Sequence, residues 1–436
     1  MDRPLTPRLR RRPSERKSGD VRVRPAAVLI GLDSMQGLQA ARILHGRGVP
    51  VIALAKDPHN DACRTNVCDE ILFVNTRNDE LIDKLLRLGS TLSQKAVLFP
   101  CEDANVRLVS RHRDRLRQYF HIALPPTDVV EMLMDKTRFY AYAQDHGLPI
   151  PRTYFLRSRE DLVAACESLT FPAILKPSNS ATRLWEKNCM FSAFKVEDFE
   201  ELNTVFTRYR EFTDVFILQE WIAGPDNNLY SCNCYIDANG EPLATFVARK
   251  VRQWPPHIGK SSLGVECRSD EVLHETLRLF GDVGYRGLGY VEFKLDERHG
   301  RQFMVEPNVG RPTGRSAIAE AGGVELLFTM YCDLLGHPLP EGRVQRYGTA
   351  KWIHLRRDFQ SALYYWRRRE LTLREWARSW RGPKAFALYS LRDPNPFLSD
   401  SWRVARTLLS RAERDRRRWT IETDERDDAV VLNEAP

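Results

Sequence analysis

Short apolar strands alternate with helical segments over the first quarter of the chain, and this alternation limits the fold more than any other feature. Ala26–Ile30 has the pattern of a buried strand and is followed by a tight turn, Gly31–Gly37. Further strands are predicted at 49–55, 70–74 and 96–100, with helices at 38–46, 80–88 and 104–120. Consecutive parallel strands need such crossover helices. We therefore expect a Rossmann-like α/β domain over residues 25–126.

The turn after the first strand does not favour a dinucleotide site. Gly31 and Gly37 do not form a GxGxxG pattern, and the second strand ends in Leu54-Ala55-Lys56 without an acidic residue. A tight strand-to-helix turn explains Gly31 without a ligand.

Residues 127–340 have a different pattern, in which strands follow one another. Strands are predicted at 173–176, 190–194, 216–219, 229–236, 242–251, 289–295 and 302–306. Asp237–Gly240 is a hairpin signal between two of them. Helices are expected at 128–135 and 136–146, the second ending at Gly147. This pattern predicts a second, α+β domain.

The remaining composition is that of a globular chain of two to three domains. The chain has 436 residues, of which 42% are hydrophobic. No apolar run approaches the ~20 residues of a membrane span, and residues 1–24 lack the apolar stretch of a signal peptide, so we expect a cytoplasmic protein. The nine cysteines are scattered without a CxxC pair, which favours buried thiols over disulfides or a zinc site.

The net charge of +8 is concentrated in two segments. Residues 1–24 carry nine basic against three acidic residues and are expected to be a disordered basic tail. Leu355–Arg381 carries eight Arg against three acids, together with three Trp, within an expected helical C-terminal extension over residues 341–410. A charged tail is expected at 411–436. These basic segments fit either a solvated surface or contact with an anionic surface, and no specific nucleic acid is expected.

Two lysines in the first part of the α+β domain occupy unusual positions. Lys136 follows Asp135 at a helix junction, where alone it would be taken for a solvated side chain. Lys176 continues the buried strand Ala173–Leu175, and a lysine there needs a partner.

Three oxygen-bearing side chains are candidates for metal ligands. Glu292 alternates with apolar neighbours on one strand, and Glu306 and Asn308 share one face of the next. Two carboxylates and an amide oxygen form the hard ligand set that Mg²⁺ prefers, although a structural salt-bridge cluster is the alternative.

Taken in order, Met134-Asp135-Lys136, Pro172–Pro177, Leu218–Asp226, Gly289–Lys294 and Val305–Arg311 resemble the ATP-grasp superfamily from about Val28 to Gly336. The resemblance implies a Rossmann-like pre-ATP-grasp domain followed by a two-part α+β ATP-grasp fold. It also implies Mg²⁺, for which Mn²⁺ could substitute, and ATP between the two halves. By this resemblance the metal ligands are Glu292, Glu306 and Asn308, and the ATP-binding residues are Lys136, Lys176, Glu220 near the adenine and Asp226 near the ribose.

Two departures from the usual ATP-grasp pattern are present. Residues 177–188, after Lys176, contain no glycine, whereas most members have a glycine-rich loop there. Arg311 also lies one residue late relative to the usual Glu-x-Asn-x-Arg. Together with Arg249–Gly259, these features resemble the carboxylate–amine ligase branch that includes D-aspartate ligases, which implies catalytic roles for Arg249, Arg252 and Arg311.

The resemblance implies an ATP-dependent, ADP-forming ligase that activates a carboxylate as an acyl phosphate and passes it to an amine. The partners would be a small carboxylic acid, such as an amino acid, and an amine acceptor. Two alternatives stay open: a catalytically reduced ATP-binding module on an anionic surface, and an ATP-grasp enzyme with a non-amine acceptor. The acid, the acceptor and the oligomeric state are not determined by the sequence.

Overall fold

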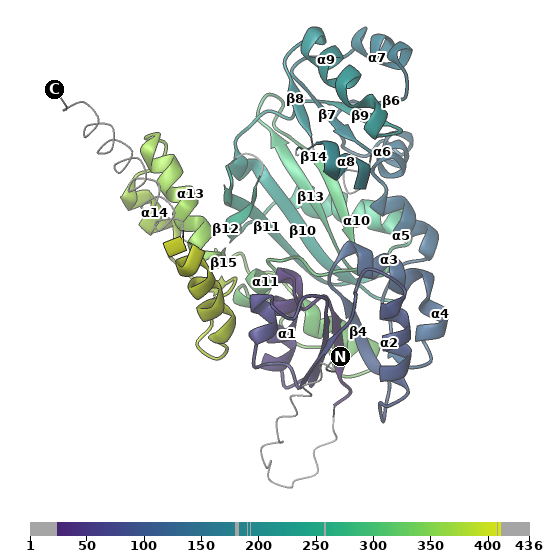
Figure 1. Cartoon of the computed structure of the whole chain (residues 1–436), viewed down its shortest axis with the longest axis vertical. Coiled ribbons are helices and arrows are strands. Elements are labelled where there is room, and N and C mark those ends of the chain that lie inside the picture. Colours follow the sequence, from purple (N-terminus) through teal and green to yellow (C-terminus); the bar gives the residue numbers. More distant parts are fainter. Residues whose placement is uncertain are drawn as a thin grey trace, which may run out of the picture.

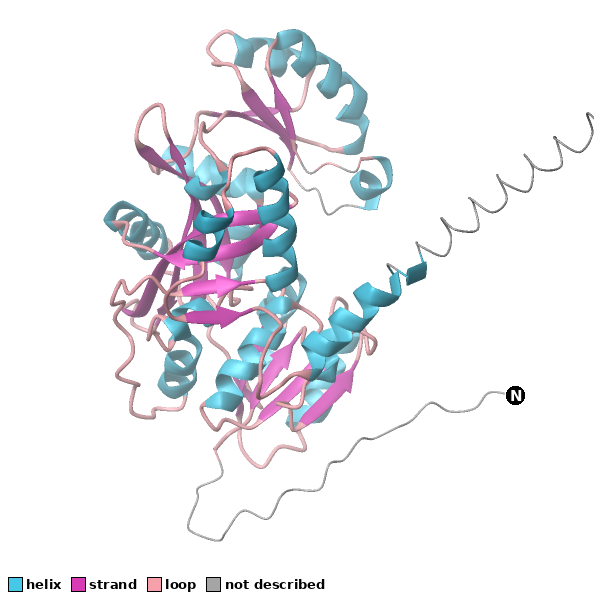
Figure 2. Cartoon of the chain, turned by 90° about the vertical axis from the view of Figure 1, so that its left-hand side faces the viewer, coloured by secondary structure: helices cyan, strands magenta, loops and turns pink. Residues whose placement is uncertain are grey.

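The computed structural model describes residues 24–178, 183–189, 191, 193–256, 259–407 and 409–410, so the two predicted tails lie outside the described residues apart from Arg24. Its strands form three sheets of five, seven and four strands. Figure 1 shows the four-stranded sheet at the top, the seven-stranded sheet in the middle and the first helices and strands below. Figure 2, seen from the side, shows helices around each group of strands.

The five-stranded sheet is parallel throughout, as the alternation of strands and helices predicts. Its order is β3 (Glu70–Phe73), β2 (Val51–Ala55), β1 (Ala27–Ile30), β4 (Ala96–Pro100) and β5 (Phe120–His121). The associated helices are α1 (Met35–Gly46), η1 (Asp61–Arg64), α2 (Glu80–Gly89), α3 (Asp103–Arg111) and α4 (Arg113–Leu116).

The turn between β1 and α1 is tight for steric reasons. The Ser34 hydroxyl accepts a hydrogen bond from the Gly37 amide and caps α1. A side chain on Gly37 would place its Cβ only 2.2 Å from the Gly31 carbonyl oxygen. Both glycines therefore serve the close approach of strand and helix, as the sequence indicates.

The seven-stranded sheet is the platform of the second domain. Its order is β14 (Arg301–Val309), β13 (Gly287–Asp296), β10 (Leu229–Ile236), β11 (Pro242–Trp254), β12 (Lys260–Glu266), β15 (Lys351–Ile353) and β16 (Lys384–Phe386). All pairs are antiparallel except β15 with β16. The predicted hairpin joins β10 to β11, and Gly240 in it has a φ of 90°.

Part of the predicted helical extension belongs to this sheet. Strands β15 and β16 lie within residues 341–410 and extend the sheet beyond β12, a strand that the sequence pattern does not reveal. The predicted helical extension begins, after β15, with two separate helices, α13 (Leu355–Arg367) and α14 (Leu373–Ser379). The break has a local cause, since Thr372 and Glu375 form a capping box that starts α14 afresh.

The four-stranded sheet forms a smaller lobe with its own core. Its antiparallel order is β6 (Thr153–Leu156), β9 (Phe216–Glu220), β7 (Ala173–Pro177) and β8 (Phe194–Val196), covered by α7 (Arg159–Cys166), α8 (Arg183–Asn188) and α9 (Phe199–Tyr209). Ala173 and Leu175 face this core together with Trp185 of α8. Lys176, one residue on, therefore projects from the opposite face of β7.

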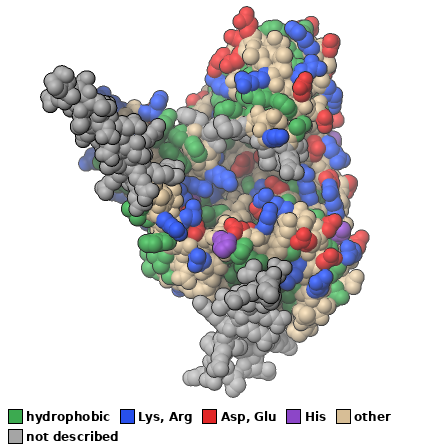
Figure 3. Space-filling view, viewed as in Figure 1, with side chains coloured by type: hydrophobic (Ala, Val, Ile, Leu, Met, Phe, Trp, Pro, Cys, Tyr) green, Lys and Arg blue, Asp and Glu red, His purple; other side chains and the backbone are tan. Residues whose placement is uncertain are grey.

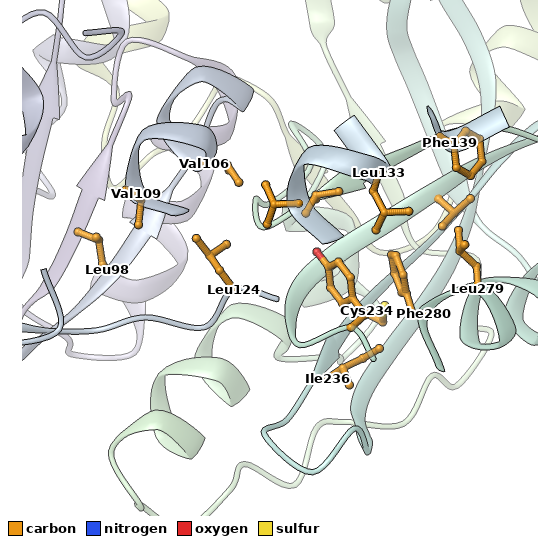
Figure 4. Packing of buried hydrophobic residues seen from close by; sticks show 14 of the residues in the cluster. Leu98, Val106, Val109, Leu124, Leu133, Phe139, Cys234, Ile236, Leu279 and Phe280 are labelled. Carbon is orange, nitrogen blue, oxygen red and sulfur yellow. The ribbon is translucent and has the colours of Figure 1, made fainter. Parts of the chain in front are cut away.

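One apolar core joins the parallel-sheet unit to the seven-stranded sheet. Figure 4 shows it running from Leu98 and Val109 of the first unit to Phe280 and Ile236 of the second. The helices α5 (Thr127–Met134), α6 (Lys136–Asp145), α10 (Asp270–Asp282), α11 (Ala317–Ala321) and α12 (Leu326–Leu334) complete the second domain. Because this core is continuous, the two units are held in one arrangement around the face where β13 and β14 lie.

A buried carboxylate attaches the C-terminal helices to the seven-stranded sheet. Asp358 of α13 has no exposed surface and accepts two hydrogen bonds from Arg252 of β11, at 2.8 and 3.0 Å. The indole nitrogens of Trp376 and Trp380 also donate to it, at 2.9 and 2.8 Å. Both oxygens of the Asp358 carboxylate therefore accept hydrogen bonds, which a buried charge requires.

All nine cysteines carry free thiols. Among the described residues, no helix combines the length and apolar character needed to cross a bilayer.

Replacing Asp358 with Ala should destabilise the protein by about 3–5 kcal/mol, because the Arg252 charge would remain buried without its partner. Urea unfolding followed by tryptophan fluorescence measures this change. The matched control is Asp270→Ala, which removes the carboxylate from the exposed Arg268–Asp270 pair and should cost about 1 kcal/mol or less. Equal costs for the two variants would contradict the anchoring role of Asp358.

Candidate active site

The candidate metal ligands meet on one face of the seven-stranded sheet. In β13, Val291 and Phe293 point into the core, so Glu292 between them projects from the other face. The antiparallel register pairs Glu292 directly with Glu306 of β14. Directly opposed residues have Cβ atoms about 5 Å apart. The structure thus brings the two predicted carboxylates together.

These two carboxylates are half-buried and repel one another. Neither makes a hydrogen bond or ion pair through its side chain with another described residue. Burial raises the pKa of Glu306, and the charge on Glu292 raises it further, while Lys136 and Lys176 oppose the shift. Like charges placed directly opposite each other destabilise a sheet unless something positive lies between them.

The third predicted ligand, Asn308, lies on the same face two residues beyond Glu306. Its side-chain oxygen accepts a hydrogen bond of 2.6 Å from Arg311. The same guanidinium donates to the Tyr290 hydroxyl at 2.8 Å and to Asp103 of the parallel-sheet unit. Arg311 therefore fixes the amide and connects the two domains at the site.

The predicted phosphate-binding lysines approach the carboxylates from the smaller lobe and from α6. Lys176 donates a hydrogen bond of 2.8 Å to the Tyr140 hydroxyl and lies 4.4 Å from the centre of that ring. Burial lowers the pKa of Lys176 to about 8, and Glu306 acts against this shift. A small cavity of about 50 Å³ is lined by Lys136, Tyr140 and Glu306, among others. The structure therefore brings both lysines to Glu306.

The predicted adenine and ribose residues lie at the hinge between the lobes. Glu220 is the last residue of β9, and its carboxylate lies 3.9 Å from Arg152. The next residue, Trp221, has Lys294 and Lys195 at 4.6 and 5.1 Å from its ring. A flat aromatic side chain at this position was not singled out from the sequence, although it follows the predicted hinge glutamate directly.

Asp226 begins the short helix η3 (Asp226–Asn228) and is in contact with the C-terminal extension. Its carboxylate accepts a hydrogen bond of 2.9 Å from the Tyr365 hydroxyl of α13. No sequence signal indicates that a residue 139 positions later lies beside it. The extension thus reaches the edge of the candidate nucleotide site.

Two of the predicted catalytic arginines point elsewhere. Arg249 is paired with Tyr230, one position away from the Ser231–Glu292 pair, so it projects from the opposite face to Glu292. Arg252 is committed to Asp358, in the buried ion pair described above. Neither arginine therefore lies beside the carboxylates. Arg249 projects from the other face of its strand, and Arg252 anchors α13 through Asp358.

Lys250 and Arg315 do lie on the face of Glu292, as does Lys294 two residues further along β13. Lys250 is the neighbour of Arg249 and therefore projects to the other side of β11. Arg315 follows Gly314, and its guanidinium reaches Ser231, the residue opposite Glu292. The sequence contains both residues in or beside motifs already noted, but only the strand register shows which side chains face the carboxylates. In the view of Figure 3, Lys and Arg side chains gather around a hollow in the middle of the molecule.

The glycine-free segment after Lys176 is described only in part. Residues 179–182 lie outside the described residues, and the chain is described again as α8 from residue 183. The Trp185 side chain is buried in the core of the smaller lobe.

The residues present fit a divalent cation with nucleotide phosphates. Glu292 and Glu306 lie opposite each other without a neutralising partner between them, and an amide oxygen lies close by, which matches the oxygen ligands of Mg²⁺. No group of three or more His, Cys, Asp or Glu side chains suited to a metal occurs among the described residues, so a zinc-like site is not found there. Remaining ligands would come from phosphates and water, as is usual for Mg²⁺.

Two ligases are among the known proteins that are similar to this chain in sequence. No family model matches the chain. It is 25% identical over 317 residues to the D-aspartate ligase of Enterococcus faecium (strain Aus0004), covering 66% of this chain and 74% of that protein. It is 26% identical over 186 residues to the D-alanine–D-alanine ligase of Pseudomonas entomophila (strain L48), covering 41% and 54%. The chain thus spans about half the length of that second relative.

Solved structures share the fold at low sequence identity. The N5-carboxyaminoimidazole ribonucleotide synthetase of Thermus thermophilus aligns with a TM-score of 0.56 at 20% identity, covering 73% of this chain and 81% of that one. The phosphoribosylglycinamide synthetase of Anaerococcus prevotii aligns with a TM-score of 0.55 at 18% identity, covering 72% and 76%.

The fold is that of ATP-grasp enzymes. In sequence the chain is similar to carboxylate–amine ligases of that superfamily, which form carbon–nitrogen bonds with ATP.

Replacing Glu306 with Gln should stabilise the protein in the absence of divalent cations and weaken its stabilisation by Mg²⁺. Because the pKa of Glu306 is raised in the folded state, wild type should lose stability as the pH rises from the carboxyl range through that raised pKa. The variant should lack this loss, so the two should differ more at the high-pH end of the range than at its low-pH end. Thermal unfolding with EDTA and with MgCl₂, across pH 4.5–8, measures both effects.

The matched control is Glu241→Gln, which changes an exposed carboxylate at the β10–β11 hairpin and should leave the pH and Mg²⁺ responses unchanged. A wild-type Mg²⁺ response in Glu306→Gln would show that Glu306 does not hold the cation.

Proposed function

We propose that the protein joins a carboxylic acid to an amine through an acyl phosphate, using ATP between the smaller lobe and the seven-stranded sheet. The observation that carries the proposal is the convergence of Glu292, Glu306, Lys136 and Lys176 from different elements. Similarity to ligases that act on D-aspartate and D-alanine supports it.

We propose that the chain is divided into five segments: the basic tail 1–24, the Rossmann-like domain 25–126, the ATP-grasp domain 127–340, the C-terminal extension 341–410 and the charged tail 411–436.

We assign the residues as follows. Glu292, Glu306 and Asn308 would hold Mg²⁺, which supplies charge neutralisation and alignment of the terminal phosphates when bound. Mn²⁺ would fit the same ligands. Lys136 and Lys176 would neutralise phosphate oxygens. Burial lowers the pKa of Lys176, and a phosphate beside it would oppose that shift.

The nucleotide base and sugar would lie at the hinge. Glu220 is placed there to accept from an amino group of the base, and Trp221 offers a flat apolar surface. Asp226 would accept from a ribose hydroxyl through its carboxylate.

Two chemical steps follow from this placement. An oxygen of the acid attacks the γ-phosphorus, a P–O bond forms, the bond to the bridging oxygen breaks, and ADP leaves. The amine nitrogen then attacks the acyl carbon, the C–O bond breaks, and phosphate leaves while the nitrogen loses a proton. Arg311 holds Asn308 and Tyr290 at the closed end of the site and is positioned to favour developing negative charge.

Acid labelled with ¹⁸O in its carboxyl group should transfer label to the inorganic phosphate released with ADP. The transfer follows because one carboxylate oxygen becomes the bridge of the acyl phosphate. The reaction contains the full-length protein, ATP, MgCl₂, one of a panel of amino acids and an amine. Mass spectrometry then measures the ¹⁸O content of the released phosphate. Glu292→Gln should lower turnover by about 100-fold or more through loss of cation binding.

Formation of AMP and pyrophosphate would contradict the proposal, because it indicates adenylation. Unlabelled phosphate with every acid in the panel would contradict it as well.

We also propose that the C-terminal segment contacts an anionic surface. Eight of the fifteen exposed large apolar side chains among the described residues lie between Phe359 and Leu409. Leu398 and Trp402 fall on one side of the helix over residues 395–407 at helical spacing, and the exposed Leu409 lies just after it in the sequence. Arg406 lies on the same helix, and exposed apolar groups beside arginines fit an anionic lipid surface.

Trp402→Ser combined with Arg406→Gln should lower partition onto vesicles containing phosphatidylserine by about tenfold, through lost apolar burial and lost charge attraction. Flotation of the full chain at low salt measures the partition, and vesicles of phosphatidylcholine alone give the charge-independent part. Val163→Ser, an exposed apolar side chain of α7, is the matched control. Equal partition of the double variant and wild type would contradict the contact.

A further inference from the structure

The hydrogen bond between Tyr365 and Asp226 joins the C-terminal extension to the candidate nucleotide site. The Tyr365 hydroxyl of α13 donates to the Asp226 carboxylate of η3 at 2.9 Å, across 139 positions of sequence. Burial raises the pKa of Tyr365, and its hydrogen bond to Asp226 raises it further. The phenol therefore keeps its proton at neutral pH and acts as the donor.

The position of Tyr365 is set by the attachment of α13 to the sheet. Asp358, two helical turns earlier, accepts hydrogen bonds from Arg252 of β11 in the buried ion pair described above. Side chains two turns apart lie on the same side of a helix, so Tyr365 lies on the side of α13 that faces the sheet. Helix α13 and η3 both pack against β11, and the phenol meets Asp226 there.

The backbone of η3 is held from the other side by β13 and the turn after it. Asn228 is buried, and its side chain donates to the Leu295 carbonyl at 3.4 Å and to the Glu297 carboxylate at 3.1 Å. With the backbone fixed in this way, the orientation of the Asp226 carboxylate depends on its side-chain torsions and on the groups around it.

Two of these groups are ammonium ions. Burial lowers the pKa of Lys294, and the charge on Asp226 is the largest of those that oppose this shift. Burial lowers the pKa of Lys250 as well, and Glu292 and Asp226 oppose it. Rotation toward either ammonium would give the Asp226 carboxylate an ion pair. A phenol donor in a fixed position favours one orientation over these alternatives.

We propose that Tyr365 is a positioning residue for the nucleotide, which holds the Asp226 carboxylate in the orientation that accepts hydrogen bonds from the ribose hydroxyls. This inference rests on the function proposed above, in which Asp226 binds the ribose. The C-terminal extension is then part of the nucleotide site, in addition to its attachment to the sheet through Asp358.

Nucleotide binding tests this role without turnover. The full-length protein with MgCl₂ is titrated with ADP and with 2′,3′-dideoxyADP, which lacks both ribose hydroxyls, and calorimetry measures the two affinities. We expect wild type to bind ADP about tenfold more tightly, because the hydroxyls donate to a charged acceptor. Tyr365→Phe, which removes only the phenolic hydroxyl, should weaken ADP binding by about three- to tenfold and leave dideoxyADP binding within about twofold.

The ratio of the two affinities separates positioning from a merely structural role. A general loosening of α13 would weaken both nucleotides alike, and a partly unfolded sample would lower the amount of active protein without changing the ratio. Asp226→Asn should lose the preference for ADP, and adding Tyr365→Phe to it should change little, since Tyr365 acts through Asp226.

The matched control is Tyr364→Phe, at the neighbouring position of α13. The Tyr364 ring contacts Tyr365 and Arg368, and its hydroxyl makes no hydrogen bond with a described residue. Its removal should therefore leave the ratio of the two affinities unchanged.

Several results would overturn the inference. Equal weakening of both nucleotides by Tyr365→Phe would make Tyr365 a structural residue only. An unchanged ratio in Tyr365→Phe with a lost ratio in Asp226→Asn would show that Asp226 binds the ribose without Tyr365, and the proposed function would stand. No preference for ADP in wild type would remove Asp226 from the ribose. A ratio that depends on both residues, together with unlabelled phosphate in the ¹⁸O experiment, would support the positioning role and refute the ligase reaction.

Discussion

The register of β13 against β14 places Glu292 opposite Glu306, and the organisation of the site depends on this pair. Two carboxylates facing one another in a half-buried position repel unless cations surround them. The surrounding structure supplies cations on each side: Lys136 and Lys176 from the region of the smaller lobe, and Lys250 and Arg315 from the sheet and the loop before α11. A pair of carboxylates can bind a magnesium ion, and the basic side chains around it can bind the phosphates of a nucleotide.

The scaffold keeps these groups together although they come from distant segments. A continuous apolar core fixes the parallel-sheet unit against the seven-stranded sheet, and Arg311 adds a polar connection between Asp103 and Asn308 across the same boundary. The C-terminal extension is fastened by the buried Asp358, and Tyr365 of the extension donates a hydrogen bond to Asp226, the residue proposed for the ribose.

Much of the fold follows from local patterns. The alternation of strand and helix before residue 125 identifies the parallel sheet because crossover connections allow little else. The hairpin at Asp237–Gly240 and the end of α6 at Gly147 follow from backbone conformations that favour glycine, with φ of 90° at Gly240 and 58° at Gly147. Strands such as β12 and β15 escape detection because pairing with neighbours, rather than composition, keeps them extended.

The sequence by itself predicted Lys176, Glu292, Glu306 and Asn308 as candidates, because they are polar residues at the end or on the face of apolar strands. Lys136, Glu220 and Asp226 were added only by the resemblance to the ATP-grasp superfamily. The sequence could not determine which residues of the basic segment Arg249–Arg252 face the carboxylates. Adjacent residues of a strand point to opposite sides, and only the pairing of β10 with β11 and β13 shows that Lys250 shares the face of Glu292 while Arg249 does not. Tertiary structure alone also decided that Arg252 serves Asp358 and that Arg315 is left without a carboxylate among the described residues, since both depend on segments that meet only after folding.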